Sequence, residues 1–139
     1  MRQVQARLTV DTGGGDLTDI TGRISRWLAE TGLVSGLLTI FCRHTSASLV
    51  IQENADPDVQ RDLITFFRRL VPEGDPLYRH TAEGPDDMPA HVRAALTQTQ
   101  LSIPFDQGRM ALGTWQGIYL FEHRRRPHQR ELVLHALGD

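Results

Sequence analysis

The stretch GLLTIFCRHTSASLVIQENADPD, residues 36–58, shows most clearly how this chain folds. Its apolar residues fall into two short runs, 36–44 and 47–54, that are rich in branched and aromatic side chains and are separated by two small polar residues. Runs of this length and composition predict two β-strands. The residues that follow predict the beginning of a helix, with Asp56 as its N-cap and Pro57 in its first turn.

Outside this stretch the chain repeats the same two patterns. Alternating apolar residues, or short branched and aromatic runs, predict further strands at 2–10, 101–105, 109–113, 117–123 and 130–137. Apolar residues at helical spacing predict helices at 17–29, 56–72 and 87–99. In the second helix we expect five residues on the buried face: Val59, Leu63, Ile64, Phe66 and Phe67. The sequence therefore predicts one α+β domain over residues 1–139.

The composition excludes several classes of protein. All 15 basic residues are arginine, so no lysine is present to form a Schiff base with a substrate or with pyridoxal phosphate. The net charge of -2 does not indicate a basic nucleic-acid-binding surface, and no apolar run is long enough to span a membrane. Cys42 is the only cysteine, so no intrachain disulfide can form. We expect a cytoplasmic protein without nucleic-acid or membrane partners.

Polar side chains lie at the ends of the two central strands. Because side chains alternate along a strand, His44 shares a face with Cys42, and Glu53 shares a face with Ile51. If these faces point to the core, His44 and Glu53 lie at its rim. An unsatisfied polar group there costs about 1 to 3 kcal/mol, so each should have a partner. A single histidine in this position is usually structural, and only further ligands nearby would indicate a functional site.

More candidate ligands lie in the long segment between the second and third helices. The segment YRHTAEGPDDMPAH, residues 78–91, contains His80, Glu83, Asp86, Asp87 and His91. Imidazole nitrogens and carboxylate oxygens are the usual ligands of Zn²⁺ and related ions. The alternative is that the carboxylates cap the third helix and the histidines lie on the surface. The spacing alone leaves both interpretations open.

The last third of the chain adds the segment LGTWQGIYLFEHRRR, residues 112–126. Its two glycines predict a tight turn that presents Trp115 and Gln116. Glu122, His123 and three arginines follow at the end of the next strand. Arginine is well shaped to hold phosphate through paired hydrogen bonds, although a charge run in a hairpin loop is most often simply solvated.

Three segments together resemble the YjbQ family. They are, in the family's order, HTSASLVIQENADPDV (residues 44–59), YRHTAEGPDDMPAH (78–91) and GRMALGTWQGIYLFEHR (108–124). The resemblance covers nearly the whole chain. It implies a two-layer, strand-rich sandwich with about three helices that assembles as a homotrimer, and activity as a secondary thiamine-phosphate synthase. Such an enzyme joins a hydroxymethylpyrimidine pyrophosphate to a thiazole phosphate and releases pyrophosphate.

The resemblance also implies roles for residues in these segments. A divalent metal or an anion is expected to bind among three histidines: His44, His80 and His91. Mg²⁺ would support the activity, and Zn²⁺ is another candidate for the histidine site. We expect catalytic roles for Glu53, Asp87 and His123. We expect substrate contacts from Asn54, Trp115, Gln116, Arg109 and Arg124.

Two other functions suit the same residues. The first is a trimeric binding protein that sequesters a metal or a phosphorylated metabolite and has only incidental activity. The second is a phosphoester hydrolase that uses a metal ion. Stoichiometric ligand without turnover would indicate the binding protein, and metal-dependent phosphate release from a generic phosphoester would indicate the hydrolase.

Overall fold

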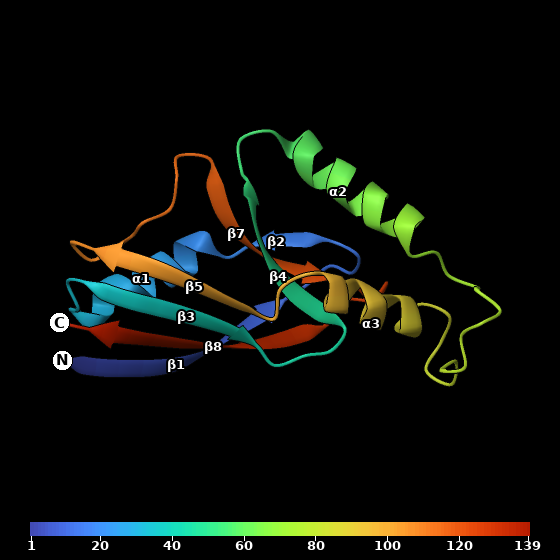
Figure 1. Ribbon diagram of the computed structural model, residues 1–139, viewed down its shortest axis with the longest axis horizontal. Coiled ribbons are helices and arrows are strands. Elements are labelled where there is room, and N and C mark those ends of the chain that lie inside the picture. The colour runs from blue at the N-terminus through green and yellow to red at the C-terminus, as the bar shows by residue number, and fades with distance from the viewer.

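Two antiparallel sheets form the framework of the computed structural model, which describes residues 1–139 (Figure 1). The strands are β1 (Arg2–Asp11), β2 (Leu17–Asp19), β3 (Gly36–Cys42), β4 (Ala47–Glu53), β5 (Gln100–Asp106), β6 (Arg109–Met110), β7 (Gln116–Glu122) and β8 (Gln129–Gly138). The helices are α1 (Thr21–Thr31), α2 (Pro57–Leu70) and α3 (Asp87–Leu96). One sheet has the order β1-β8-β3-β5-β6, and the other has the order β2-β7-β4. The prediction of an α+β fold with three helices is confirmed.

The five-stranded sheet buries one of its faces. In β3, the side chains of Leu38, Ile40 and Cys42 point to the core and are at most 1% exposed. The neighbouring strand β8, which pairs with both β1 and β3, continues the apolar row with its own alternating residues. On the opposite face of β3, Phe41 is 44% exposed. The alternation in the sequence therefore predicts correctly which face of this sheet is buried.

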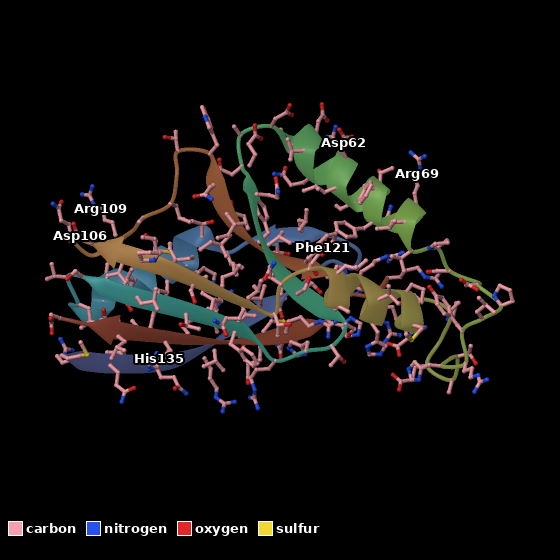
Figure 2. All side chains as sticks on the ribbon, viewed as in Figure 1. Asp62, Arg69, Asp106, Arg109, Phe121 and His135 are labelled. Carbon is pink, nitrogen blue, oxygen red and sulfur yellow. The ribbon has the colours of Figure 1, made fainter.

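The three-stranded sheet is covered on both faces. In β7, Ile118 and Leu120 belong to the main core, whereas Tyr119 and Phe121 point to the other side. Helix α2 packs over that side, and its Phe67 ring meets the Phe121 ring edge-on with centroids 5.5 Å apart (Figure 2). Burial on both faces explains why β7 is a continuous apolar run and does not alternate.

Helix α2 begins as its sequence predicts. The Asp56 carboxylate accepts a hydrogen bond of 2.9 Å from the Asp58 backbone N–H, and Pro57 opens the first turn. Our prediction of a buried Phe66 is wrong, because its side chain is 55% exposed. The other four residues of the expected buried face are only half-buried, so the helix covers the sheet with part of its apolar surface. No helix of the chain has the length and apolar character needed to cross a membrane.

Several element boundaries differ from the sequence prediction; for example, the third helix ends at Leu96 and not at residue 99. Residues Leu17–Asp19 form a strand paired with β7, and the helix begins only at Thr21. The hydrogen bonds to β7 fix these residues in an extended conformation, although Leu17 and Ile20 fit a helical spacing. The predicted strand at 109–113 is also shorter, because only Arg109–Met110 pair with β5 before the chain leaves the sheet.

Candidate functional site

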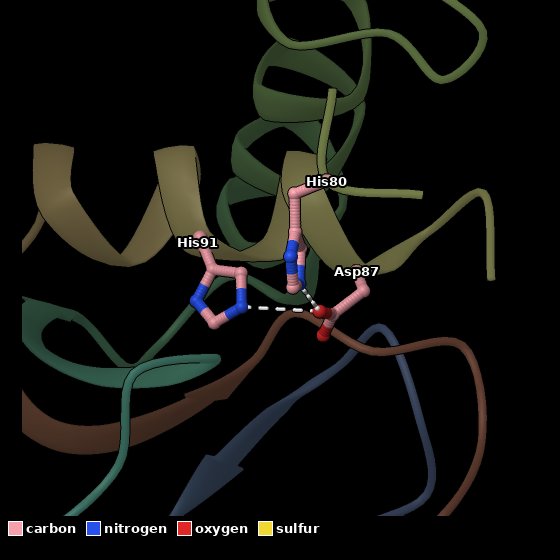
Figure 3. A group of neighbouring side chains, drawn as sticks. All are labelled: His80, Asp87 and His91. Atoms are coloured by element: carbon pink, nitrogen blue, oxygen red, sulfur yellow. Dashed lines mark hydrogen bonds and ion pairs between the residues drawn. The ribbon is translucent and has the colours of Figure 1, made fainter. Parts of the chain in front are cut away.

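One carboxylate and two imidazoles meet where the loop after α2 joins α3 (Figure 3). Asp87 Oδ2 lies 2.7 Å from His80 Nε2 and 3.1 Å from His91 Nε2. Helix geometry brings Asp87 and His91 together, because residues four apart lie on one face. His80 comes from the loop, and its ring packs edge-on against the His91 ring with centroids 5.4 Å apart. The structure therefore gathers three of the expected site residues, which we call the histidine-aspartate cluster.

The hydrogen bonds of His91 direct its Nε2 atom, and not Nδ1, at the Asp87 carboxylate. His91 Nδ1 lies 2.9 Å from the Thr45 carbonyl oxygen, which can only accept a hydrogen bond, so Nδ1 carries a proton. In the neutral ring Nε2 then has a lone pair, and this lone pair faces the Asp87 carboxylate. Two acceptors at this distance repel each other unless a proton or a metal ion lies between them. Metal-binding histidines commonly use a carbonyl in this way to fix the ring and its tautomer.

Arg124 holds the carboxylates of Asp86 and Asp87 from the other side. Its Nη1 atom lies 2.8 Å from Asp87 Oδ1, and its Nε atom lies 3.0 Å from Asp86 Oδ2. Burial opposes ionisation of Asp86, but hydrogen bonds from Arg124 and the Arg125 backbone N–H lower its pKa to about 2. Burial also opposes ionisation of Asp87, and the His80 hydrogen bond with the neighbouring charges keeps its pKa below the ordinary value. The Asp86 side chain makes no helix-capping hydrogen bond, so the capping interpretation does not describe this carboxylate.

His44 lies outside the histidine-aspartate cluster. Its Nε2 atom accepts a hydrogen bond of 2.8 Å from the Glu131 backbone N–H, and burial lowers its pKa. The expected partner of this strand-end histidine is therefore a backbone group on β8. The adjacent residue Thr45, and not His44 itself, contacts the cluster through its carbonyl.

Four other expected site residues gather at the far end of the three-stranded sheet: Glu53, Asn54, Trp115 and Gln116. The Glu53 carboxylate accepts a hydrogen bond of 3.0 Å from the Asp56 N–H, and Gln116 Oε1 accepts one of 2.7 Å from the Gly113 N–H. β4 pairs with β7 from Ala47 at one end to Glu53 at the other. Six steps of about 3.3 Å along a strand separate these ends by about 20 Å. The structure does not bring this group to the histidine-aspartate cluster.

Arg109 is also remote from the cluster. It lies in β6 at the end of β5 that is farther from α3, where it pairs in the ladder with Asp106 (Figure 2). Of the two arginines that we expect to contact substrate, only Arg124 lies beside the histidine-aspartate cluster.

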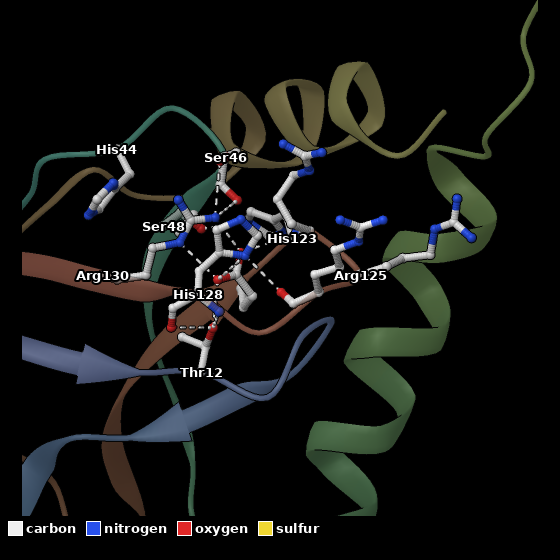
Figure 4. A network of polar contacts seen from close by, with 12 residues as sticks. Thr12, His44, Ser46, Ser48, His123, Arg125, His128 and Arg130 are labelled. Carbon is white, nitrogen blue, oxygen red and sulfur yellow. Dashed lines mark hydrogen bonds and ion pairs between the residues drawn. The ribbon is translucent and has the colours of Figure 1, made fainter. Parts of the chain in front are cut away.

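A second polar network is buried along β7 (Figure 4). Glu122 is fully buried and accepts hydrogen bonds from the Thr12 hydroxyl at 2.7 Å and from Arg130 Nε at 2.8 Å. His123 is 2% exposed, and its Nε2 atom lies 2.8 Å from Ser48 Oγ. Burial, followed by the charge of Arg93, lowers the pKa of His123 to about 3, so this ring is neutral at physiological pH. No hydrogen bond joins His123 to the histidine-aspartate cluster.

Arg130 is not among the residues that we expect in a polar site, although the sequence pattern of β8 contains a signal for it. Arg130 is in phase with Leu132 and Leu134, whose side chains form the buried face of the strand. A charged residue in a buried row requires an opposite charge nearby. The pattern thus indicates a buried acidic partner, which the structure identifies as Glu122.

Comparisons with known proteins agree with the fold and with the three sequence segments. A model of the family described as UPF0047 protein YjbQ-like matches residues 6–139. A UPF0047 protein of Synechocystis sp. is 54% identical over 138 residues, which cover 99% of this chain and 94% of that protein. The UPF0047 protein YjbQ of Escherichia coli O157:H7 is 40% identical over 136 residues, covering 97% and 98% of the two chains. The crystal structure of a hypothetical protein from Aeropyrum pernix K1 superposes with a TM-score of 0.89 at 31% identity, covering 98% and 99%.

Proposed function

Because this chain belongs to the UPF0047 YjbQ-like family, we propose that it is a metal-dependent enzyme acting on a phosphorylated small molecule. The observation that carries the proposal is the Asp87 oxygen that faces Nε2 of both His80 and His91. The proposed reaction is the synthesis of thiamine phosphate, with release of pyrophosphate. Support for this particular reaction comes from the resemblance of the three sequence segments.

The donor atoms of the histidine-aspartate cluster fit a divalent cation. One ligand atom from each of the three residues lies within 4.8 Å of the others. Two imidazole nitrogens and one carboxylate oxygen form a ligand set that Zn²⁺ and similar ions accept, with a further position left for water or substrate. A cation bound there would supply positive charge to stabilise a departing diphosphate.

Neighbouring residues hold the proposed metal ligands in place. The Thr45 carbonyl orients the His91 ring, and Arg124 orients the Asp87 carboxylate. Asp87 is 2% exposed, so its charge interacts strongly with whatever cation lies in front of it. His44, which the resemblance assigns to the metal, has a backbone partner instead, and we propose His80, Asp87 and His91 as the ligand set.

Replacing His91 with alanine tests the ligand set. We expect one divalent ion per chain in the wild type and an affinity for Zn²⁺ at least about tenfold lower in His91→Ala, because loss of even an orienting partner has an effect of this size. His44→Ala is the matched control and should bind Zn²⁺ as the wild type does. Calorimetric titration of chelator-treated protein gives both values, and equal effects of the two substitutions would contradict the assignment.

The His91→Ala variant also tests the reaction. Wild-type protein incubated with the two phosphorylated substrates and Mg²⁺ should form thiamine phosphate faster than His91→Ala. Absence of product in all samples, together with stoichiometric metal in the wild type, would reject the synthase and leave the binding protein. Metal-dependent hydrolysis of a generic phosphoester would favour the hydrolase instead.

We also propose that the protein is a homotrimer. The outer face of the five-stranded sheet presents three large apolar side chains that are 40% to 44% exposed: Leu37, Phe41 and Leu137. Light scattering coupled to gel filtration should give three times the 15.7 kDa mass of the chain. Phe41→Asp should shift the protein toward monomer, because it introduces a charge into an apolar contact. A monomeric wild type would contradict the proposal.

A further inference from the structure

Three arginines line a recess between α2, α3 and the segment after β7. Arg68 comes from α2, Arg93 from α3, and Arg125 from the segment after β7. The recess has a volume of about 510 Å³, and Pro72 is the only apolar side chain among its lining residues. A smaller space of about 10 Å³ adjoins it and shares the first two arginines and His123.

Positive charge in the recess exceeds negative charge. Arg125 Nε lies 3.0 Å from a carboxylate oxygen of Glu73, but Arg68 and Arg93 form no ion pair. Arg93 donates to the Val71 carbonyl at 2.7 Å, whereas its Nε atom is buried without a hydrogen-bond partner. Burial lowers the pKa of Arg93, the Glu73 carboxylate raises it, and the neighbouring Arg68 guanidinium lowers it. Arg68 and Arg125 are exposed, whereas Arg93 is half-buried and has a donor without a partner. Desolvating a charge without a paired counter-charge is costly, so the recess favours a bound anion.

His123 lies at the inner end of the recess. Thr97 Oγ1 is 2.9 Å from the Arg93 carbonyl oxygen, which can only accept a hydrogen bond, so the Thr97 hydroxyl donates there and accepts the Ser48 proton at 2.6 Å. Ser48 Oγ then accepts from His123 Nε2 at 2.8 Å, and the neutral ring has its lone pair at Nδ1. The donors that the recess offers to an anion are therefore those of its arginines.

We propose that the three-arginine recess binds the phosphoryl group of a small phosphorylated molecule. A phosphate monoester offers three acceptor oxygens and nearly two negative charges, which match several guanidinium donors better than the single charge of a carboxylate does. The inference deepens the proposed function and rests on it for the identity of the anion as part of a substrate. Arg124, which holds Asp87, directly precedes Arg125, so the recess and the histidine-aspartate cluster share one segment.

The neighbouring residues Arg68 and Arg69 provide a matched pair for the test. Both are exposed on α2, but only Arg68 lines the recess, and Arg69 points away from it (Figure 2). Metal-free, chelator-treated protein is titrated with pyrophosphate and with inorganic phosphate in a low-salt buffer. We expect Arg68→Ala to weaken binding by about tenfold or more, as loss of a charge-assisted hydrogen bond does, and Arg69→Ala to leave it unchanged.

Glu73→Gln should have the opposite effect. Its carboxylate competes with the anion for Arg125, so the neutral amide is expected to tighten phosphate binding, a change that a merely structural residue would not produce. His91→Ala should bind pyrophosphate as the wild type does, which separates this proposal from the metal site. Wild-type protein that binds neither anion, or equal affinities of the Arg68 and Arg69 variants, would overturn the proposal.

Discussion

Replacing Glu122 with alanine is expected to lower the free energy of unfolding by about 3 to 5 kcal/mol, because the substitution leaves a buried guanidinium without its counter-charge. Glu122 is fully buried, and Arg130 is 6% exposed. Burial opposes ionisation of Glu122, but hydrogen bonds from Arg130 and Thr12 hold its pKa below the ordinary value. Arg130 also binds the Ser46 carbonyl, so the ion pair connects β7 and β8 to the segment between β3 and β4.

Urea unfolding measures this effect through the shift of the transition midpoint. Arg61→Ala is the control, because it breaks an exposed ion pair with Asp58 and should cost about 0.5 kcal/mol or less. The double variant Glu122→Leu with Arg130→Leu should lose less stability than Glu122→Ala, since it leaves no unpaired charge in the core. If Glu122→Ala and Arg61→Ala had equal effects, the buried pair would not stabilise the fold in the way that we describe.

The sequence predicts those parts of the fold that local patterns determine. The buried faces of β3 and β8 follow from alternation, and the beginning of α2 follows from Asp56 and Pro57. Strand β2 could not be predicted, because its three residues are extended only through hydrogen bonds to β7, far along the chain. Where a long-range partner decides the conformation, local spacing is not sufficient.

The candidate site likewise contains some contacts that the sequence predicts and others that it does not. Asp87 and His91 can be paired from the sequence, because they are four residues apart in a predicted helix. The contacts of His80, Thr45 and Arg124 depend on how distant segments pack, and no local pattern contains that information. Residues of one sequence segment also need not lie together in the fold. Glu53 and Trp115 share their segments with Thr45 and Arg124, which contact the histidine-aspartate cluster, and yet lie at the other end of β4 and β7.

Asp87→Asn is expected to reduce the affinity for a divalent cation by about 100-fold or more, the upper end of the effects reported for groups around a metal. The amide keeps the shape of the side chain but loses the charge that faces His80 and His91. The asparagine oxygen can keep the hydrogen bond from Arg124, and the amide nitrogen then faces the two histidines in place of a carboxylate oxygen. Calorimetric titration with Zn²⁺ measures the affinity, and thermal unfolding checks that the variant remains folded.

Asp86→Asn is the matched control for the metal experiment and provides a test of pH dependence. Asp86 binds Arg124 but faces neither histidine, so its substitution should lower Zn²⁺ affinity much less than Asp87→Asn does. The folded-state pKa of Asp86 is about 2, below its ordinary value of 3.8. A carboxyl group with a lowered pKa stabilises the fold above its ordinary pKa, and this contribution is lost as the pH falls through the folded value. The wild type should therefore be more stable than Asp86→Asn near neutral pH, and the difference should shrink as the pH falls from about 4 to about 2. If the stability difference between the two proteins stayed constant over this range, the ion pair between Asp86 and Arg124 would not stabilise the fold through the charge of Asp86.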